Sequence, residues 1–346
     1  MSCQVHRSAK KDETCTNEEQ VLMKDELLAR VLVILKEAGF IVSRPCEARS
    51  FDLAARRSEL TLLAKILHNI DGINEDVARG IKRAAFCLLA SPLVIGERKG
   101  TALLEDDVVY HRYGIPAFNS QTLYNYFVEG LDPYVYSATG GIYVTINGEQ
   151  MKAAREKKGL SLGELAAQLG VSRRSVSKYE EGQMSTTLEL ALMLEELLEA
   201  NLIEPREIVK TELGALPQDI VKQGVEDAAS SLEKDILSIM EEIGFAIFTT
   251  AHAPFSAVSY PEPPSRTPVA CAKILTGVSE YTERMIKRAQ IVSSLSQVTR
   301  TKSVFVVEGT SKYQQIDHTV LIAKDELKRI KDPEEFSSVM EERAKE

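Results

Sequence analysis

The residues best suited to bind a ligand gather in one short segment, from Ser172 to Lys178. This segment combines two adjacent arginines, a lysine and several serines. A guanidinium presents a planar fork of donors that matches the O6 and N7 acceptors of guanine, and it also binds phosphate. Hydroxyl groups can add short hydrogen bonds to phosphate oxygens. With two residues from the preceding segments, the candidate contact residues are Lys152, Ser161, Ser172, Arg173, Arg174, Ser175, Ser177 and Lys178.

The charge of this region differs from that of the chain as a whole. The 346 residues contain 42 Lys and Arg and 51 Asp and Glu, for a net charge of −9. A protein that coats nucleic acid without sequence preference is usually basic overall, so this class is disfavoured. Between Glu149 and Gly182, however, seven basic and five acidic residues give a local charge of +2, which leaves −11 for the rest of the chain. The basic face is therefore predicted to be local.

Two short helices are predicted to position these residues. Ser161 is a good N-cap, and Glu164 three residues later completes a capping box. Gly170 supplies the turn between the helices, because a positive φ costs glycine little. Ser172 then caps a second helix over residues 173–181, and Gly182 ends it.

The segment from Gln150 to Leu198 resembles the helix-turn-helix of the Cro and phage-repressor family, also called the xenobiotic-response-element family. The resemblance implies that the second helix enters the major groove of DNA, and that the protein binds as a homodimer to half-sites about 34 Å apart. Where the family has an Arg–Glu ion pair across the domain, this sequence has Arg155 and Glu180. Leu162 departs from the family, which often has a phosphate-contacting Gln at that position, so the resemblance supports no such contact here.

Four sequence blocks occur twice in the same order, once on each side of the helix-turn-helix. The first copy contains LKEAGF, SFDLAAR, LTLLAKIL and GIKRA, and the second contains MEEIGF, PFSAVSY, VACAKIL and MIKRA. Each copy is predicted to form helix, strand, strand, strand, helix and strand, since its short apolar runs suit a sheet covered by helices. The alternative is two unrelated α/β segments that share the AKIL string. The strands expected in the first copy are 40–43, 51–56, 60–67 and 93–96, with a helix at 75–90.

The repeated unit resembles the restriction-endonuclease-like fold, whose motif is PD-(D/E)-x-K. In that fold an Asp and a second acid hold a divalent metal, and the Lys steadies the attacking water or the developing charge. Asp52 and Lys65 match the first and last of these positions in the first copy. The second acid would stand two residues before the Lys, where this sequence has Leu63.

The second copy departs further from the motif. Ser256 or Ala257 takes the place of the Asp, Cys271 takes the place of the second acid, and Lys273 takes the place of the Lys. A hard divalent cation needs several oxygen ligands, so neither copy is expected to hold a metal or to cut DNA, and no catalytic residue or cofactor is predicted. A carboxylate on the following helix is the alternative source of a ligand. The candidates for that role are Glu75, Asp76, Glu280 and Glu283.

The sequence thus predicts a multidomain protein of mixed α/β and all-α class, in which a central Cro/repressor-type helix-turn-helix bundle is flanked by two restriction-endonuclease-like α/β domains. The expected divisions are a flexible tail at 1–23, an α/β domain at 24–134, the DNA-binding domain at 135–200, a linker at 201–230, a second α/β domain at 231–330 and a solvated, charged helix or tail at 331–346.

Over nearly the whole chain beyond the first tail, this arrangement resembles helix-turn-helix transcriptional regulators of archaea. The resemblance implies a sequence-specific regulator that binds double-stranded DNA and is not an enzyme, with basal transcription factors or a small-molecule effector as further partners. Two alternatives stay open. The chain could be a metal-dependent nuclease targeted by the helix-turn-helix, or a coactivator-like adaptor to basal transcription factors. Metal-dependent cleavage would favour the nuclease, and absent or sequence-independent DNA binding would favour the adaptor.

A reducing, cytoplasmic location is expected, because the cysteines are odd in number and widely scattered and because no apolar signal segment is found. The apolar stretch from Ala84 to Gly96 is interrupted by Ser91 and Pro92, and it falls short of the roughly 20 residues that cross a bilayer. No membrane partner is therefore predicted. No pair of cysteines has C-x-x-C spacing, and the five are Cys3, Cys15, Cys46, Cys87 and Cys271.

Overall fold

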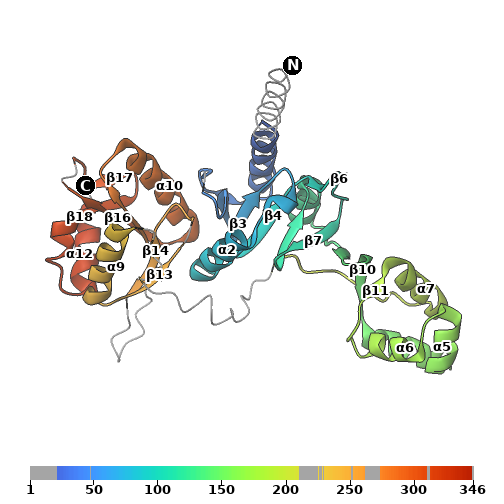
Figure 1. The fold of residues 1–346 in the computed structure, drawn as a ribbon. Helices are drawn as coiled ribbons and strands as arrows, with labels where there is room; N and C mark the ends of the chain where they lie inside the picture. The colour runs from blue at the N-terminus through green and yellow to red at the C-terminus, as the bar shows by residue number, and fades with distance from the viewer. Residues whose placement is uncertain are drawn as a thin grey trace, which may run out of the picture. The chain divides into compact units, whose positions relative to one another are not determined.

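The computed structural model describes residues 22–46, 48–209, 225, 228, 230–250, 252–261, 273–309 and 312–344. These residues form two compact units. The first contains residues 22–34, 67–71 and 94–209, and the second contains 35–66, 72–93 and the described residues from 225 onward. Strand β4 (Ser91–Ile95), which is labelled in Figure 1, is divided between the units after Leu93. Of the expected tail at 1–23, residues 1–21 lie outside the described residues, whereas residues 22 and 23 belong to a helix, so the expectation is wrong for these two.

The first unit is built on a sheet that leads into a helical bundle. Its strand order is β4-β8-β7-β9-β10-β11, and β12 pairs with β10. Its strands after β4 are β5 (Arg98–Lys99), β6 (Ala102–Leu103), β7 (Val108–Arg112), β8 (Ile115–Phe118), β9 (Val135–Ala138), β10 (Gly141–Ile146), β11 (Thr186–Thr187) and β12 (Ile203–Glu204). Between them lie the short helices α3 (Ser120–Tyr124) and η2 (Asn125–Glu129), and η1 (Ile70–Gly72) comes before β4.

Four helices complete the bundle: α4 (Gly148–Lys157), α5 (Leu162–Leu169), α6 (Arg173–Glu180) and α7 (Leu188–Leu198). Their apolar faces share one core with β10, through Val144 and Ile146. That core also includes Leu202, which is 1% exposed, and β12 pairs with β10 beside it. The expected linker at 201–230 is therefore wrong at its start, because residues 201–204 belong to the bundle. Of the rest of that range, 210–224, 226, 227 and 229 lie outside the described residues.

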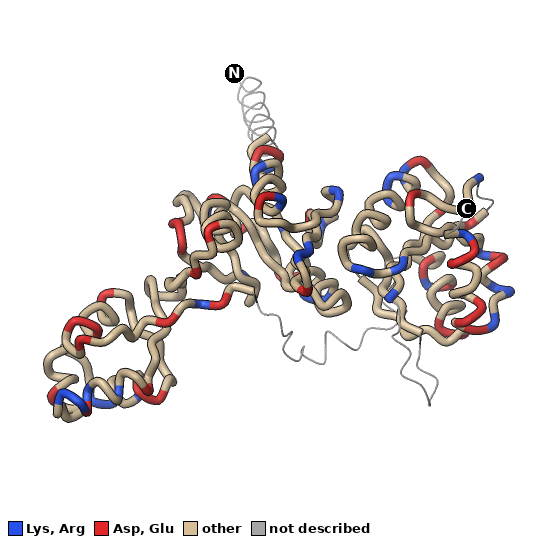
Figure 2. Tube along the Cα trace, turned by 180° about the vertical axis from the view of Figure 1, so that it is seen from behind, with Lys and Arg blue, Asp and Glu red and all other residues tan. Residues whose placement is uncertain are grey.

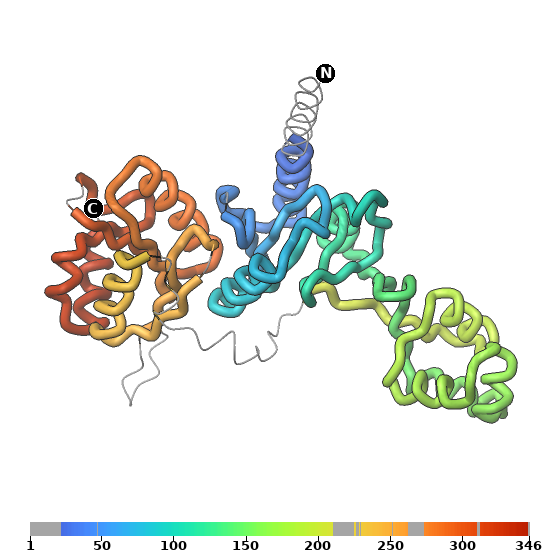
Figure 3. Tube along the Cα trace, in the orientation of Figure 1, coloured from blue at the N-terminus to red at the C-terminus, as the bar shows by residue number. Residues whose placement is uncertain are grey.

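The second unit contains the second copy of the repeat and residues 35–66 and 72–93 of the first copy. Each copy has the predicted element order, and Figure 3 shows the course of the chain from blue to cyan through the first copy and from yellow to orange through the second. The first copy begins with a helix over residues 22–37. After it come β1 (Ile41–Val42), β2 (Leu53–Arg57), β3 (Leu60–Ile66), α2 (Glu75–Leu88) and β4. The second has α9 (Ser231–Ile243), β13 (Phe245–Thr249), β14 (Ala257–Pro261), β15 (Ile274–Glu280), α10 (Glu283–Thr299) and β16 (Lys302–Glu308). Four more elements end the chain: β17 (Gln315–Ile316), β18 (Thr319–Ala323), α11 (Lys324–Leu327) and α12 (Pro333–Arg343).

The sheet of the second copy is buried on both faces. Its strand order is β13-β14-β15-β16-β18-β17, and β16 is parallel to both of its neighbours. Side chains alternate across β16, so that Val304 and Val306 pack with α9 and α12, whereas Phe305 and Val307 pack with α10. Such two-sided burial explains why this strand reads as a continuous apolar run.

The expected solvated segment at 331–346 is wrong for α12. Phe336 is 0% exposed and Met340 is 4% exposed, and both lie in the core beneath the sheet. The Phe336 ring meets the Phe245 ring edge-on at a centroid distance of 5.1 Å. The charged residues of the segment occupy the outer face of a helix whose inner face is apolar, which is the usual pattern of an amphipathic helix.

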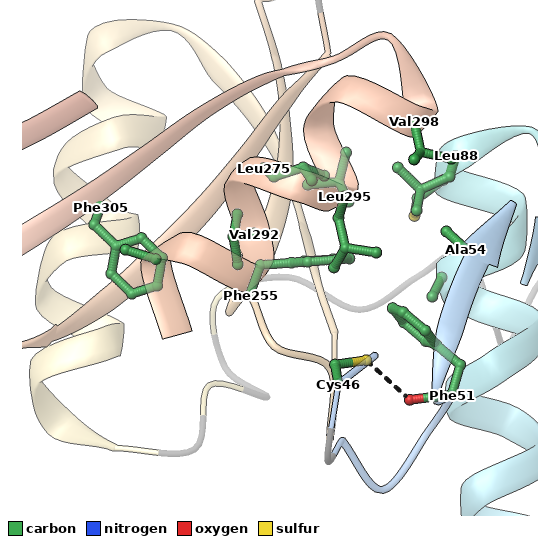
Figure 4. Packing of buried hydrophobic residues seen from close by; sticks show 14 of the residues in the cluster. Cys46, Phe51, Ala54, Leu88, Phe255, Leu275, Val292, Leu295, Val298 and Phe305 are labelled. Carbon is green, nitrogen blue, oxygen red and sulfur yellow. Dashed lines mark hydrogen bonds between the residues drawn. The ribbon is translucent and has the colours of Figure 1, made fainter. Parts of the chain in front are cut away.

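The two copies also pack against each other inside the second unit. Figure 4 shows Phe51, Ala54 and Leu88 of the first copy beside Phe255, Val292 and Leu295 of the second. All six are less than 5% exposed. One continuous hydrophobic core therefore joins the copies.

Candidate DNA-binding surface

Hydrogen bonds at the start of α5 fix the first helix of the motif. The Glu164 amide donates to Ser161 Oγ at 3.2 Å, and the Ser161 amide donates to Glu164 Oε2 at 2.7 Å. This is the predicted capping box. Gly170 follows α5 with φ at +67°, as the predicted turn requires. Leu165, Ala166 and Leu169 are buried, so α5 is held by its inner face while its cap stays exposed.

The second helix, α6, begins at the predicted cap. Ser172 Oγ accepts a hydrogen bond from the Ser175 amide at 3.0 Å, and the two hydroxyl oxygens lie 2.9 Å apart. Ser177 Oγ donates to Glu181 Oε1 at 2.7 Å. Ser175 and Ser177 thus already take part in hydrogen bonds within the helix.

The basic candidates lie on the outer side of the bundle. Lys152, Ser161, Ser172, Arg173 and Arg174 are exposed, and Ser175, Ser177 and Lys178 are half-buried. In the part of the chain that the structure describes, no carboxylate lies within ion-pair distance of Lys152, Arg173, Arg174 or Lys178. Basic positions follow one another along α6 in Figure 2. Their positive charge is therefore available to an anionic partner.

A buried ion pair fixes the end of α6 against α4. Arg155 Nε donates to Glu180 Oε1 at 2.5 Å, and Arg155 Nη2 donates to Glu180 Oε2 at 3.0 Å. The side chains are 9% and 8% exposed, and Arg155 also donates to the Leu160 carbonyl at 2.8 Å. The hydrogen bonds to Glu180 raise the pKa of Arg155. The predicted pair is confirmed, and it is bidentate.

One contact between the same helices was not predicted. A Cβ at Gly148 would lie 2.4 Å from the Glu180 carbonyl oxygen and 2.7 Å from that of Tyr179. The first residue of α4 therefore approaches the end of α6 more closely than any side chain allows. The sequence carries no local signal for this glycine, because its φ lies outside the left-handed region and its neighbour is distant in the chain.

The nuclease-like position of the first copy holds an ion pair, and the motif position of the second acid is taken by a leucine. Lys65 Nζ lies 3.2 Å from Asp52 Oδ2, and the two side chains are 9% and 3% exposed. The Ile66 amide donates to the same carboxylate oxygen at 2.7 Å. Leu63, at the acid position, is 0% exposed in the hydrophobic core.

The second copy uses a strand register that differs from the one the AKIL string suggests. The Asp52 amide donates to the Ala64 carbonyl in the first copy, and the Ser256 amide donates to the Thr276 carbonyl in the second, both at 2.8 Å. Two residues after Ala64, the Ile66 amide donates to the Asp52 carboxylate. Two residues after Thr276, the Val278 amide donates to Ser256 Oγ. Ser256, not Ala257, is therefore the equivalent of Asp52.

The same register makes Gly277 the equivalent of Lys65 and Leu275 the equivalent of Leu63. The prediction that Lys273 occupies the motif position is thus wrong by four residues. A Cβ at Gly277 would lie 2.3 Å from the Phe305 ring, so no side chain fits there. Cys271 lies outside the described residues.

Lys273 lies beside an aromatic ring and not at the motif position. Its ammonium lies 5.8 Å from the centroid of the Tyr260 ring, and burial lowers the pKa of Lys273. Among the described residues there is no group of three or more His, Cys, Asp or Glu that could hold a metal ion. Within those same residues, no helix is long and apolar enough to span a bilayer.

Comparison with known proteins agrees with both parts of this description. Residues 24–133 match the family model described as PD-(D/E)XK superfamily domain, and residues 151–204 match the model described as Helix-turn-helix. No solved structure matches the chain.

Similar proteins cover almost the whole chain. A protein of Methanococcoides burtonii is 44% identical over 326 residues, which is 94% of this chain and 98% of the relative. A protein of Methanosarcina acetivorans is 41% identical over 329 residues (93% and 98%), and one of Natronomonas pharaonis is 40% identical over 326 residues (93% and 99%). All three are named as HTH-type transcriptional regulatory proteins. The chain belongs to this family of HTH-type transcriptional regulatory proteins.

Proposed function

We propose that this protein regulates transcription by placing α6 in the major groove of operator DNA. The observation that carries the proposal is the outward position of Arg173 and Arg174 at the start of α6, where neither is paired with a described carboxylate. In helix-turn-helix proteins the first residues of the second helix reach the base edges. The names of the three relatives support the same function.

The contact residues divide by the chemistry that each can perform. Arg173 and Arg174 are long and exposed, and each can pair bidentately with guanine. Lys152 and Lys178 present point charges suited to phosphate, as do the exposed hydroxyls of Ser161 and Ser172. Ser175 and Ser177 are secondary candidates, because their side chains are half-buried whereas those of Ser161 and Ser172 are exposed. Two copies of the chain would bind the two half-sites of an operator.

The experiment is selection of bound fragments from a genomic library, followed by binding measurements on the recovered site and on random DNA. Recovery of one shared motif supports the proposal. The matched control is Lys157→Ala, which removes an exposed charge of α4 outside the proposed set. Enrichment of no motif, with equal binding to all fragments or with none, would exclude a sequence-specific regulator and favour the adaptor.

We further infer that neither nuclease-like copy cleaves DNA. Metal-dependent hydrolysis needs carboxylates that hold a metal beside the attacked phosphate. The first copy retains Asp52 but has buried Leu63 at the second position, and the second copy has Ser256 and Leu275. The test is incubation of the purified protein with supercoiled, linear and branched DNA in Mg²⁺ and in Mn²⁺. Cleavage that disappears in both Asp52→Ala and Lys65→Ala would contradict the inference.

A further inference from the structure

The second copy differs from the first in what fills its nuclease-like position. In the first copy the buried Asp52–Lys65 pair closes the position, with Nζ and Oδ2 3.2 Å apart. In the second, Ser256 and Gly277 replace both members of the pair, so no charge pair can form there. A long side chain from α10 takes part instead: Arg288 Nη2 donates to Ser256 Oγ at 3.4 Å, and its guanidinium lies 5.6 Å from the Phe305 ring centroid.

A cavity of about 1030 Å³ opens beside Ser256 and Arg288. Its walls come from the loop that precedes β2 in the first copy, from the equivalent loop before β14, and from the first turns of α10. Ligand sites of small molecules usually measure about 300–1,000 Å³, so the cavity is large enough for a metabolite.

The ionisable side chains that line this cavity are mostly basic. They are Arg49, Glu233, His252, Arg284, Lys287 and Arg288. Four are arginine or lysine, one is histidine and one is glutamate. Among the described residues, no carboxylate lies within ion-pair distance of the four cations. Among the described residues that line the cavity, positively charged side chains therefore outnumber the single carboxylate, that of Glu233.

The position of each cation shows how an anion would be held. Arg288 is the innermost: it is half-buried, and it donates to the Pro254 carbonyl at 2.5 Å as well as to Ser256. Burial lowers the pKa of Arg288, which means that its charge is poorly solvated and would gain from a nearby anion. Arg49, Arg284 and Lys287 are exposed and can move toward a ligand. The start of α10, a helix of 17 residues, adds the positive end of its dipole.

Glu233 provides a built-in counter-charge at one wall. It accepts a hydrogen bond from Ser256 Oγ at 2.6 Å. Its negative charge also acts on Arg288 and raises the pKa of that guanidinium, against the larger effect of burial. In the first copy the start of α2 is acidic instead, with Glu75 and Asp76, and Arg79 is paired to both. Arg83, further along α2, is buried and donates to Thr249 Oγ1 at 3.3 Å.

We propose that this cavity is a binding site for a small phosphate-bearing anion, held by Arg288 at its base and by Arg49, Arg284 and Lys287 at its mouth. Several guanidinium and ammonium donors around one enclosed space match the several acceptor oxygens of a phosphate or pyrophosphate group. The site is separate from the helix-turn-helix and does not depend on the function proposed for it.

Calorimetric titration of the full-length protein with inorganic pyrophosphate tests the site. Saturable binding at one site per chain is expected. The double variant Arg284→Gln/Lys287→Gln should weaken this binding by about tenfold or more, because hydrogen bonds to charged groups are the stronger kind. Glu233→Gln should strengthen it severalfold, since it removes the opposing charge and keeps an acceptor for Ser256. Arg329→Gln, an exposed arginine elsewhere in the same unit, is the matched control and should bind as the unchanged protein does.

A second probe distinguishes a free anion from the phosphates of DNA. A short random duplex is titrated into the same four proteins, whose circular dichroism spectra must match that of the unchanged chain. Loss of pyrophosphate binding in the double variant, with duplex binding retained, supports the proposal. Absence of saturable binding at millimolar pyrophosphate would overturn it, as would equal affinity in the double variant. Binding of the duplex alone, lost in the double variant, would replace the small-anion site with a DNA contact.

Discussion

Arg56 and Tyr260 occupy equivalent positions in the two copies, and each donates a hydrogen bond to a helix of the other copy. Arg56 Nε donates to the Val298 carbonyl of α10 at 2.6 Å, and Tyr260 Oη donates to the Cys87 carbonyl of α2. Each acceptor stands two residues before a left-handed helix cap, Leu89 or Arg300, both with φ at +53°. Such reciprocal contacts are typical of a two-fold interface. The copies therefore pack as a pseudo-symmetric pair within one chain.

This reciprocity predicts that Tyr260→Phe destabilises the protein. The substitution keeps the ring but removes the donor to the Cys87 carbonyl, which lies among residues of the buried core. An unsatisfied buried acceptor costs about 1–3 kcal/mol. Denaturant unfolding should show a loss of that size, whereas Tyr113→Phe, at a side chain that is 49% exposed, should change little. Equal stabilities for the two variants would mean that the reciprocal bond contributes nothing.

Substitutions in and near α6 should separate base contacts from phosphate contacts. If Arg173 or Arg174 reads guanine, truncation to Ala should cost about 1–3 kcal/mol on the operator and relax preference at one base position. Lys152→Ala and Lys178→Ala should instead weaken binding to all DNA sequences alike. Each should also lower, by about one unit, the slope of the logarithm of the binding constant against the logarithm of the salt concentration. Binding isotherms on operator and random DNA at several salt concentrations provide the measurement. Equal losses on both DNAs for all four variants would contradict the base-reading role.

The buried pair of Arg155 and Glu180 should stabilise the bundle through direct coupling. Removal of one partner from a buried ion pair costs about 3–5 kcal/mol, because the other charge is left without compensation. A double-mutant cycle with Arg155→Met and Glu180→Gln should therefore give a large coupling energy in urea unfolding. The exposed pair of Arg79 and Glu75 is the control, and its coupling should lie at about 0–1 kcal/mol. A coupling near zero for the buried pair would show that it forms no effective contact.

Two glycines of the same bundle should respond in opposite directions to alanine. At Gly148 the new Cβ would meet the backbone of Tyr179 and Glu180, and such overpacking costs about 1–3 kcal/mol. Gly163 lies in α5 with its nearest neighbour, Ser161 Oγ, at 3.9 Å from the added Cβ. Gly163→Ala should therefore stabilise the helix by about 0.5–1 kcal/mol. Thermal unfolding of both variants measures whether each substitution raises or lowers the stability. Stabilisation by Gly148→Ala would contradict the close approach of Gly148 to the backbone of Tyr179 and Glu180.

Cys87 should make the stability of the protein fall at high pH. Burial raises the pKa of this thiol from 9.0 to about 11. Because the folded state holds the proton more tightly than the unfolded state, the contribution is complete below pH 9 and is lost as the pH rises toward 11. A shift of about two pKa units corresponds to roughly 3 kcal/mol. Urea unfolding between pH 7 and pH 11 should show a shallower decline for Cys87→Ala than for the unchanged chain, and identical declines would contradict the buried thiol.

The helix-turn-helix could be predicted from the sequence because its determinants act over a few residues. Ser161 and Glu164 cap the same turn, and Gly170 ends the helix that they begin. Capping hydrogen bonds and a left-handed dihedral depend on neighbours in the chain, so their residue types are visible without a fold. The pair of Arg155 and Glu180 was found through the family resemblance, and the structure confirms it. Contact of α6 with DNA remains a prediction.

The element order of the two copies was also determined by the sequence, since apolar runs and turn residues mark each strand and helix. The register within the second copy was not. A shift of four residues keeps every side chain of a strand on the same face, so Lys273 and Gly277 satisfy the same apolar pattern. Only the pairing of β14 with β15 and the Phe305 ring against Gly277 decide between them.

Contacts between distant segments likewise depended on the tertiary structure. Phe336 looked like one apolar residue in a charged segment, and it is buried because α12 packs beside α9 against Phe245. Gly148 is required by the backbone of Tyr179 and Glu180, which the chain brings to it only through the crossing of α4 and α6. The sequence by itself determined which residues begin, cap and end the elements, because those interactions are local. The fold decided which surfaces meet, because burial belongs to pairs of elements and not to either one alone.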